Sequence, residues 1–179
     1  ARALHFAHEA QVVHRDVKPE NVLLDAYGRV LLSDFGVAKC LHADRLTLTG
    51  EVIGTPAYMA PEQHLGLVVD ARSDQFAFCV SLWEAIYGKR PFRGDSVLAI
   101  ALNVCEGGPP QLPDSPPIPT WLRRLLLQGL STAASDRFEN MDALVEELAR
   151  DRTRTRKAVW LGLGGVTAVA AGVLATVAL

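Results

Sequence analysis

Cysteine is scarce in this chain of 179 residues, and neither sign of charge predominates. The three cysteines, at positions 40, 79 and 105, are scattered and lack the paired spacing of zinc ligands. A disulfide-stabilised scaffold and a structural zinc site are therefore excluded, and free thiols in a reducing compartment are expected. Lys and Arg total 18 against 20 Asp and Glu, so the sequence indicates no basic surface for nucleic acid.

Long uncharged runs are absent except at the C-terminal end, where residues 158–179 contain no charged side chain. A helix needs roughly 20 apolar residues to cross a bilayer, so this run predicts a transmembrane helix over 158–179. The preceding segment, 151–157, carries a basic cluster made of Arg152, Arg154, Arg156 and Lys157. The positive-inside rule places this juxtamembrane segment, and the residues before it, in the cytoplasm. The sequence therefore predicts a protein located in a membrane, which it crosses once.

Small residues recur at every fourth position of the predicted span, at Gly164, Ala168 and Gly172. This spacing puts them on one helix face, where they permit close approach of a second helix. The pattern indicates a possible homodimer. A plain anchor is the alternative, because Gly and Ala are common in membrane spans.

Three short motifs follow one another along the chain. Residues 14–21 read His-Arg-Asp-Val-Lys-Pro-Glu-Asn, residues 34–36 read Asp-Phe-Gly, and residues 60–62 read Ala-Pro-Glu. Each tripeptide alone is common, but the three in this order and at these spacings are typical of a phosphoryl-transfer site. Such a site needs a carboxylate near the incoming hydroxyl, oxygen ligands for Mg²⁺, and a cation on the migrating phosphate.

These motifs resemble those of the bacterial eukaryotic-type (Hanks-type) transmembrane serine/threonine protein kinases. The resemblance implies that Asp16 orients the substrate hydroxyl and accepts its proton, and that Lys18 contacts the γ-phosphate of ATP. It implies that Asn21 and Asp34 hold Mg²⁺ by oxygen. It also implies that Leu23 lies under the adenine ring. The implied partners are ATP, a protein substrate and the membrane.

Further residues match the supporting structure of this family. The resemblance implies that Thr55 hydrogen-bonds the catalytic Asp and Lys, and that Asp74 accepts backbone N–H groups of the catalytic loop. It implies that His14 and Phe35 stack in a spine that couples the two lobes of a kinase. For Asp74 alone, without the motifs, a helix N-cap would be the preferred interpretation.

The same resemblance implies a buried ion pair between Arg137 and Glu62, although an isolated Arg137 would be interpreted as a surface charge. It also suggests Thr47 and Thr49 as autophosphorylation sites. Both threonines lie between the Asp-Phe-Gly and Ala-Pro-Glu motifs. Arg15 precedes the catalytic Asp and would pair with a phosphothreonine. Ordinary loop threonines are the alternative.

The predicted fold class is α+β, a mostly helical kinase C-lobe with a small β-hairpin. Short apolar runs at 22–24 and 30–32 flank a turn and predict the hairpin. Apolar periodicity predicts several helices. They are a helix ending near residue 8, a buried helix over 75–87, and helices at 96–105, 121–130 and 141–148.

We expect three segments: a partial kinase domain over 1–150, the juxtamembrane segment and the transmembrane helix. The Gly-rich loop, strand Lys and helix Glu of the family are not found, so we expect a C-lobe without its N-lobe that is inactive alone. The alternative is a non-catalytic, membrane-tethered scaffold, which has no physical need for the catalytic residues. A small-molecule phosphotransferase is disfavoured by the complete segment 54–62, which builds a peptide-docking surface in the family.

Overall fold

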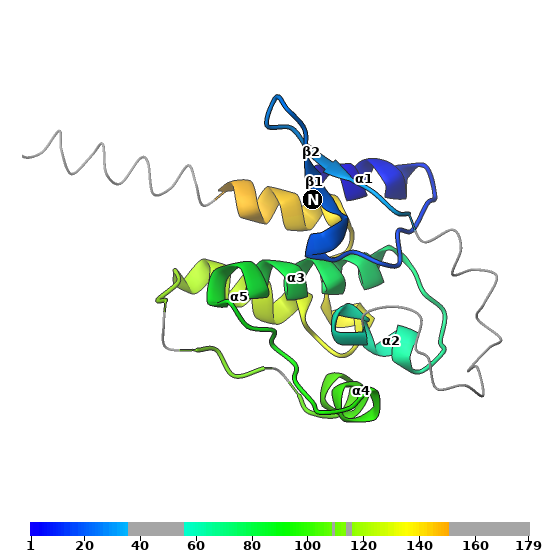
Figure 1. The fold of residues 1–179 in the computed structure, drawn as a ribbon, viewed down its shortest axis with the longest axis vertical. Helices are drawn as coiled ribbons and strands as arrows, with labels where there is room; N and C mark the ends of the chain where they lie inside the picture. The colour runs from blue at the N-terminus through cyan, green and yellow to red at the C-terminus, as the bar shows by residue number, and fades with distance from the viewer. Residues whose placement is uncertain (36–55, 109, 114–115, 151–179) are drawn as a thin grey trace, which may run out of the picture. The chain divides into compact units, whose positions relative to one another are not determined.

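The computed structural model describes residues 1–35, 56–108, 110–113 and 116–150 (Figure 1). The helices are α1 (Arg2–Glu9), α2 (Pro61–His64), α3 (Ala71–Tyr87), α4 (Val97–Cys105) and α5 (Thr120–Gly129), followed by a helical stretch over 141–150. The strands are β1 (Val22–Leu24) and β2 (Val30–Leu32), and the 3₁₀ turns are η1 (Pro19–Asn21), η3 (Pro56–Tyr58) and η4 (Ala134–Asp136). The chain divides into two compact units, Ala1–Val145 and Glu146–Leu179. The site lies within the first unit.

The hairpin has the bounds that the sequence predicts. β1 and β2 pair antiparallel, with Leu23 opposite Leu31. Gly28 closes the turn with a φ of 75°, and the Asp25 side chain accepts the backbone N–H groups of Tyr27 and Arg29. The left-handed conformation favours glycine at this turn position. The ribbon leaves apolar side chains in solvent, since Leu23 is 48% exposed.

Helix α3 is the centre of the first unit, with α1 and the hairpin above it and α2 and α4 below it in Figure 1. Asp70 caps its first turn by accepting the N–H of Arg72, and Gly88 ends it in the left-handed conformation. Phe76, Val80 and Trp83 are buried, as the nearly uniform apolar character of this helix predicts. The first turns also bury three polar side chains, those of Ser73, Asp74 and Gln75.

The remaining predicted helices are confirmed and complete the core. Leu4 and Ala7 of α1 are buried at helical spacing. Helix α5 contacts α3 and buries Leu125 and Leu126, and Met141 and Leu144 of the last stretch are buried as well. Ser96 caps α4, whose outer residues Val97, Leu98 and Leu102 remain exposed.

The structure bears on the predicted free thiols but does not describe the predicted transmembrane helix. Cys79 and Cys105 are free thiols, as predicted, and burial raises the pKa of Cys79 to about 12, which keeps it protonated. Cys40 lies outside the described residues. Among the residues that the structure describes, no helix combines the length and apolarity required to span a bilayer. The predicted span, 158–179, lies outside them.

Candidate functional site

The loop before the hairpin gathers three of the predicted site residues. Lys18 Nζ lies 3.1 Å from Asp16 Oδ2, and each of these side chains is 18% exposed. The turn η1 brings Asn21 back toward the same residue, where its Nδ2 donates to the Asp16 carbonyl at 2.8 Å and lies 3.5 Å from Oδ2. A carboxylate, an ammonium and a carboxamide therefore converge at one partly exposed point.

Asp74, in the first turn of α3, holds this loop in place through two hydrogen bonds. Its Oδ2 accepts the N–H of His14 and its Oδ1 accepts the N–H of Arg15, each at 2.8 Å. Arg15 adopts a left-handed φ of 67°, which is costly for a residue other than glycine. Asp74 thus stabilises a strained backbone immediately before Asp16, while Asp70 performs the capping role.

His8, to which the sequence assigns no role, completes the surroundings of Asp74. Its Nε2 lies 2.7 Å from Asp74 Oδ2, and the two side chains are 8% and 1% exposed. The carboxylate can only accept, so Nε2–H of His8 donates to it. His8 Nδ1 is buried without a hydrogen-bond partner among the described residues. α1 therefore helps to hold the buried carboxylate that orders the loop.

His14 joins the loop to the strand end that carries Asp34. Its Nδ1 accepts the Asp16 N–H at 3.3 Å, so Nε2 carries the proton and donates to the Ser33 carbonyl at 2.9 Å. The His14 and Phe35 rings lie 4.5 Å apart between centroids, in a tilted arrangement. The Ser33 N–H in turn donates to the Asn21 carbonyl at 2.9 Å. The two predicted metal-ligating segments are thereby cross-linked through Ser33.

The donor set for a divalent cation consists of oxygen atoms. Asn21 uses its Nδ2 toward Asp16, and no described hydrogen bond occupies its Oδ1. Asp34 is exposed, with a left-handed φ of 57°, and accepts a hydrogen bond from the Ser33 hydroxyl at 3.4 Å. Carboxamide and carboxylate oxygens fit a hard cation such as Mg²⁺. Within the described part of the chain, no cluster of three or more His, Cys, Asp or Glu side chains forms a metal site.

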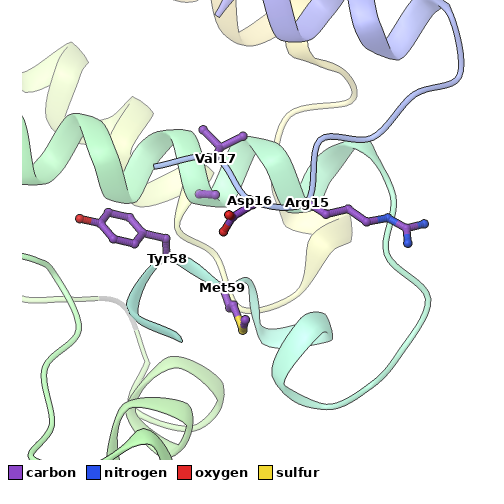
Figure 2. Close-up of a pocket in the computed structure, with 6 residues that line it drawn as sticks. Arg15, Asp16, Val17, Tyr58 and Met59 are labelled. Carbon is purple, nitrogen blue, oxygen red and sulfur yellow. The ribbon is translucent and has the colours of Figure 1, made fainter. Parts of the chain in front are cut away.

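A shallow pocket lies beside Asp16, lined by residues from the loop, η3 and α3 (Figure 2). Tyr58 and Met59 line it next to Asp16, with their side chains directed away from Asp16, and the Arg15 side chain extends to the opposite side from Tyr58. The Tyr58 hydroxyl donates a short hydrogen bond to Glu84. Burial, that hydrogen bond and the Glu84 charge raise the pKa of Tyr58 well above its usual value, so it remains a neutral donor. The pocket wall is therefore rigidly fixed to α3.

The ion pair between Arg137 and Glu62 is present and holds α2 to the core. Arg137 Nη1 and Nη2 lie 2.7 and 2.9 Å from the two Glu62 carboxylate oxygens. The three remaining N–H donors of the guanidinium bond the carbonyls of Ser131, Arg72 and Thr132. Every donor of this buried cation is thus satisfied, which a buried charge requires.

Glu62 is charged in this environment for a definite reason. Burial alone would raise its pKa, but hydrogen bonds from Arg137 and Ser73, together with the Arg137 charge, outweigh it and lower the pKa below its usual value. The Ser73 hydroxyl donates to Glu62 Oε1 at 2.6 Å. The sequence predicts the pair but not this contribution of Ser73.

The contacts described around Asp16 do not include several of the predicted residues. Leu23 is on the exposed hairpin, and its role under an adenine ring remains a prediction. Thr55, Thr47 and Thr49 lie outside the described residues. The contacts of His8, Gln63 and Ser73 were missed, because each depends on packing between elements far apart in the sequence. The only local signal was Gln63, the third residue of α2, where a side chain can reach back to the N-cap.

Comparison with known proteins agrees with these features. A family model described as the protein kinase domain matches residues 1–150. The chain is 41% identical to the serine/threonine-protein kinase PknA of Mycobacterium tuberculosis over 155 residues, which are 87% of this chain and 36% of PknA. It is 32% identical to the serine/threonine-protein kinase PrkC of Bacillus subtilis over 147 residues, 82% of this chain and 23% of PrkC. The chain therefore spans about a third or less of these relatives' length.

Proposed function

Because the chain belongs to the protein kinase family, we propose that it supplies the catalytic loop of a serine/threonine protein kinase. The reaction transfers the γ-phosphoryl group of ATP to a serine or threonine hydroxyl of a protein. The observation that carries the proposal is the cluster of Asp16, Lys18 and Asn21, fixed from below by Asp74. Bacterial relatives named serine/threonine-protein kinases support this choice of substrate class.

In the proposed reaction, Asp16 orients the attacking hydroxyl and accepts its proton as the new P–O bond forms. Lys18 stabilises negative charge on the migrating phosphoryl group, since its ammonium already lies beside Asp16. The hydroxyl of the polypeptide substrate would approach Asp16 at its partly exposed carboxylate.

The oxygen atoms of Asn21 and Asp34 would hold Mg²⁺. When bound, this cation neutralises the charge on the ATP phosphates. Asn21 uses Nδ2 for its contact with the Asp16 carbonyl, so its Oδ1 remains as the oxygen for this task. Thr55 would assist Asp16 and Lys18 by a hydrogen bond.

The nucleotide needs more protein than these residues provide. Leu23 would form one wall for the adenine, and the exposed apolar surface of the hairpin leaves room for an opposite wall. We propose that the full-length protein provides that wall and that residues 1–179 alone transfer no phosphate.

The test is transfer of radiolabelled phosphate from ATP to a protein substrate by the full-length protein, with phosphoamino-acid analysis of the product. Label in phosphoserine or phosphothreonine is expected, together with a requirement for Mg²⁺. A folded full-length protein that labels no protein would contradict the proposal and favour a non-catalytic scaffold. Label on a small molecule alone would favour a different phosphotransferase.

Autophosphorylation at Thr47 and Thr49 is expected to activate the full-length protein. Arg15 extends away from the pocket in Figure 2 and offers a bidentate cation to a phosphothreonine. Intact-mass and tandem mass spectrometry after incubation with ATP should find phosphate at one or both positions. The Thr47→Val, Thr49→Val variant should show lower activity. Its control is Thr120→Val, an exposed threonine at the start of α5. Two unmodified threonines in an active preparation would contradict this prediction.

Residues 158–179 are expected to anchor the protein in a membrane with residues 1–150 in the cytoplasm. The support is an uncharged run of sufficient length behind the basic segment 151–157. After alkaline carbonate washing, the chain should remain in the membrane pellet, and a version ending at residue 150 should appear in the supernatant. Release of residues 1–179 to the supernatant would overturn the anchor and, with it, the homodimer expected through Gly164, Ala168 and Gly172.

A further inference from the structure

Arg15, immediately before Asp16, is held on both sides of its strained backbone. Its N–H donates to Asp74 Oδ1 at 2.8 Å, and its carbonyl oxygen accepts from Gln63 Nε2 at 3.0 Å. That carbonyl belongs to the peptide plane that also contains the Asp16 N–H. The hydrogen bond from Gln63 therefore fixes the plane from which the Asp16 side chain leaves the chain.

Gln63 uses both ends of its carboxamide. Nε2 donates to Arg15, and Oε1 accepts the N–H of Ala60, the residue that caps α2, at 3.0 Å. A carboxamide can donate and accept at once, which a carboxylate or a hydrocarbon cannot do. One side chain thereby joins two segments 48 residues apart in the sequence.

The base of this bridge is rigid. The neighbouring residue in α2, Glu62, is held by two hydrogen bonds from Arg137 and one from Ser73. Gln63 thus projects from a fixed turn of helix toward the loop. The Ala60 N–H donates to Oε1 of Gln63, and Nε2 of the same carboxamide donates to the Arg15 carbonyl. A displacement of residues 56–60 would therefore shift the carboxamide and change its hydrogen bond to Arg15.

We propose that Gln63 is a positioning residue that couples the chain segment ending at Ala60 to the orientation of Asp16. The proposal rests on the proposed kinase function and identifies a residue that positions the catalytic group of the same site. Capping of α2 is the competing role, and it uses only the Oε1 contact to Ala60. The two roles can be separated because the donor Nε2 and the acceptor Oε1 are different atoms of the carboxamide.

Gln63→Glu is the variant that separates them. The glutamate carboxylate still accepts from the Ala60 N–H, and its negative charge is favourable near the first turn of α2. It has no N–H to donate, so it places an oxygen against the Arg15 carbonyl oxygen and that hydrogen bond is lost. Gln63→Met removes both contacts at similar size. Gln111→Glu is the matched control, because Gln111 is exposed and outside the site.

The first measurement uses the full chain in detergent micelles and needs no enzymatic activity. In Gln63→Glu, the carbonyl ¹³C resonance of Arg15 should move upfield through loss of its hydrogen bond, while the Ala60 amide keeps its acceptor and its proton resonance should not move upfield. Gln63→Met should shift both resonances, and Gln111→Glu neither. An unmoved Arg15 carbonyl resonance in Gln63→Glu would overturn the proposal.

The second measurement uses the full-length protein. Gln63→Glu should lower kcat by about tenfold, as a small misplacement of a catalytic group does, with KM for ATP unchanged. The difference in kcat between Gln63→Glu and the wild type should become smaller as pH falls, because a protonated carboxyl group at position 63 can donate a hydrogen bond to the Arg15 carbonyl. A merely structural role would not produce that pH dependence, and equal kcat in Gln63→Glu and Gln111→Glu would overturn the coupling. An inactive wild type with a shifted Arg15 resonance would instead overturn the proposed function.

Discussion

Replacement of Asp16 by asparagine is expected to lower kcat of the full-length protein by about 10²–10⁴-fold, the contribution of a positioned general base. Asparagine keeps the size of the side chain and can still accept a hydrogen bond from Asn21 Nδ2. It cannot take up the proton of the substrate hydroxyl at neutral pH. KM for ATP should stay close to the wild-type value, because Asp16 serves the hydroxyl and not the nucleotide. Steady-state kinetics with a protein substrate measure both quantities.

Asp95→Asn is the control for this experiment, since Asp95 is exposed before α4 and makes the same change of charge. Its kinetics should match the wild type. The melting temperatures of both variants should be close to that of the wild-type protein, so that lost activity is not lost folding. A folded Asp16→Asn protein with wild-type turnover would show that another group accepts the proton.

Local patterns in the sequence predicted the elements that carry the site. The apolar runs and the turn between them fix the bounds of β1 and β2, because turn geometry and pairing register are determined over a few residues. The apolar character of α3 predicts its burial for the same local reason. The position of Asp74 within α3 follows from the resemblance, and its two hydrogen bonds to the loop are present.

Contacts between residues far apart in the sequence could not be predicted from local patterns. Gln63 reaches Arg15, and His8 reaches Asp74 over 66 residues, only because the packing of α1, α2 and α3 brings them together. The local sequence indicates at most that Gln63 can reach back to its own N-cap; it indicates neither the contact of Gln63 with Arg15 nor that of His8 with Asp74. Burial of polar groups is decided by tertiary packing, and their partners then follow from the need to satisfy each donor and acceptor.

Arg137→Met is expected to lower the free energy of unfolding by about 3–5 kcal/mol at neutral pH. The reason is the Glu62 carboxylate, which would stay buried without its cation, held among the described residues by the Ser73 hydroxyl and a backbone N–H. Three carbonyl groups, of Ser131, Arg72 and Thr132, would also lose their donor. Thermal unfolding of the chain in mild detergent should show a midpoint lowered by roughly 6–20 °C.

The loss should depend on pH with a definite sign. In the wild type, the lowered pKa of Glu62 means that the pair stabilises the fold above the pKa of an unfolded glutamate, about 4.3. That contribution disappears as pH falls through the lowered folded-state pKa. In Arg137→Met, burial acts without a cation and raises the Glu62 pKa, so protonation relieves the variant as pH falls. The deficit of the variant should therefore be smaller at pH 5 than at pH 7.

Two further variants identify the cause of this loss. Arg124→Met changes an exposed arginine of α5 and should shift the midpoint little, which excludes a general effect of replacing arginine by methionine. The double variant Glu62→Gln, Arg137→Met removes the buried charge and should recover part of the stability lost by Arg137→Met. If Arg137→Met unfolded at the wild-type temperature, or if its deficit were the same at pH 5 and pH 7, the buried pair would not be what secures α2. The rigid base assigned to Gln63 would then be lost as well, because α2 holds that side chain against the loop through Glu62.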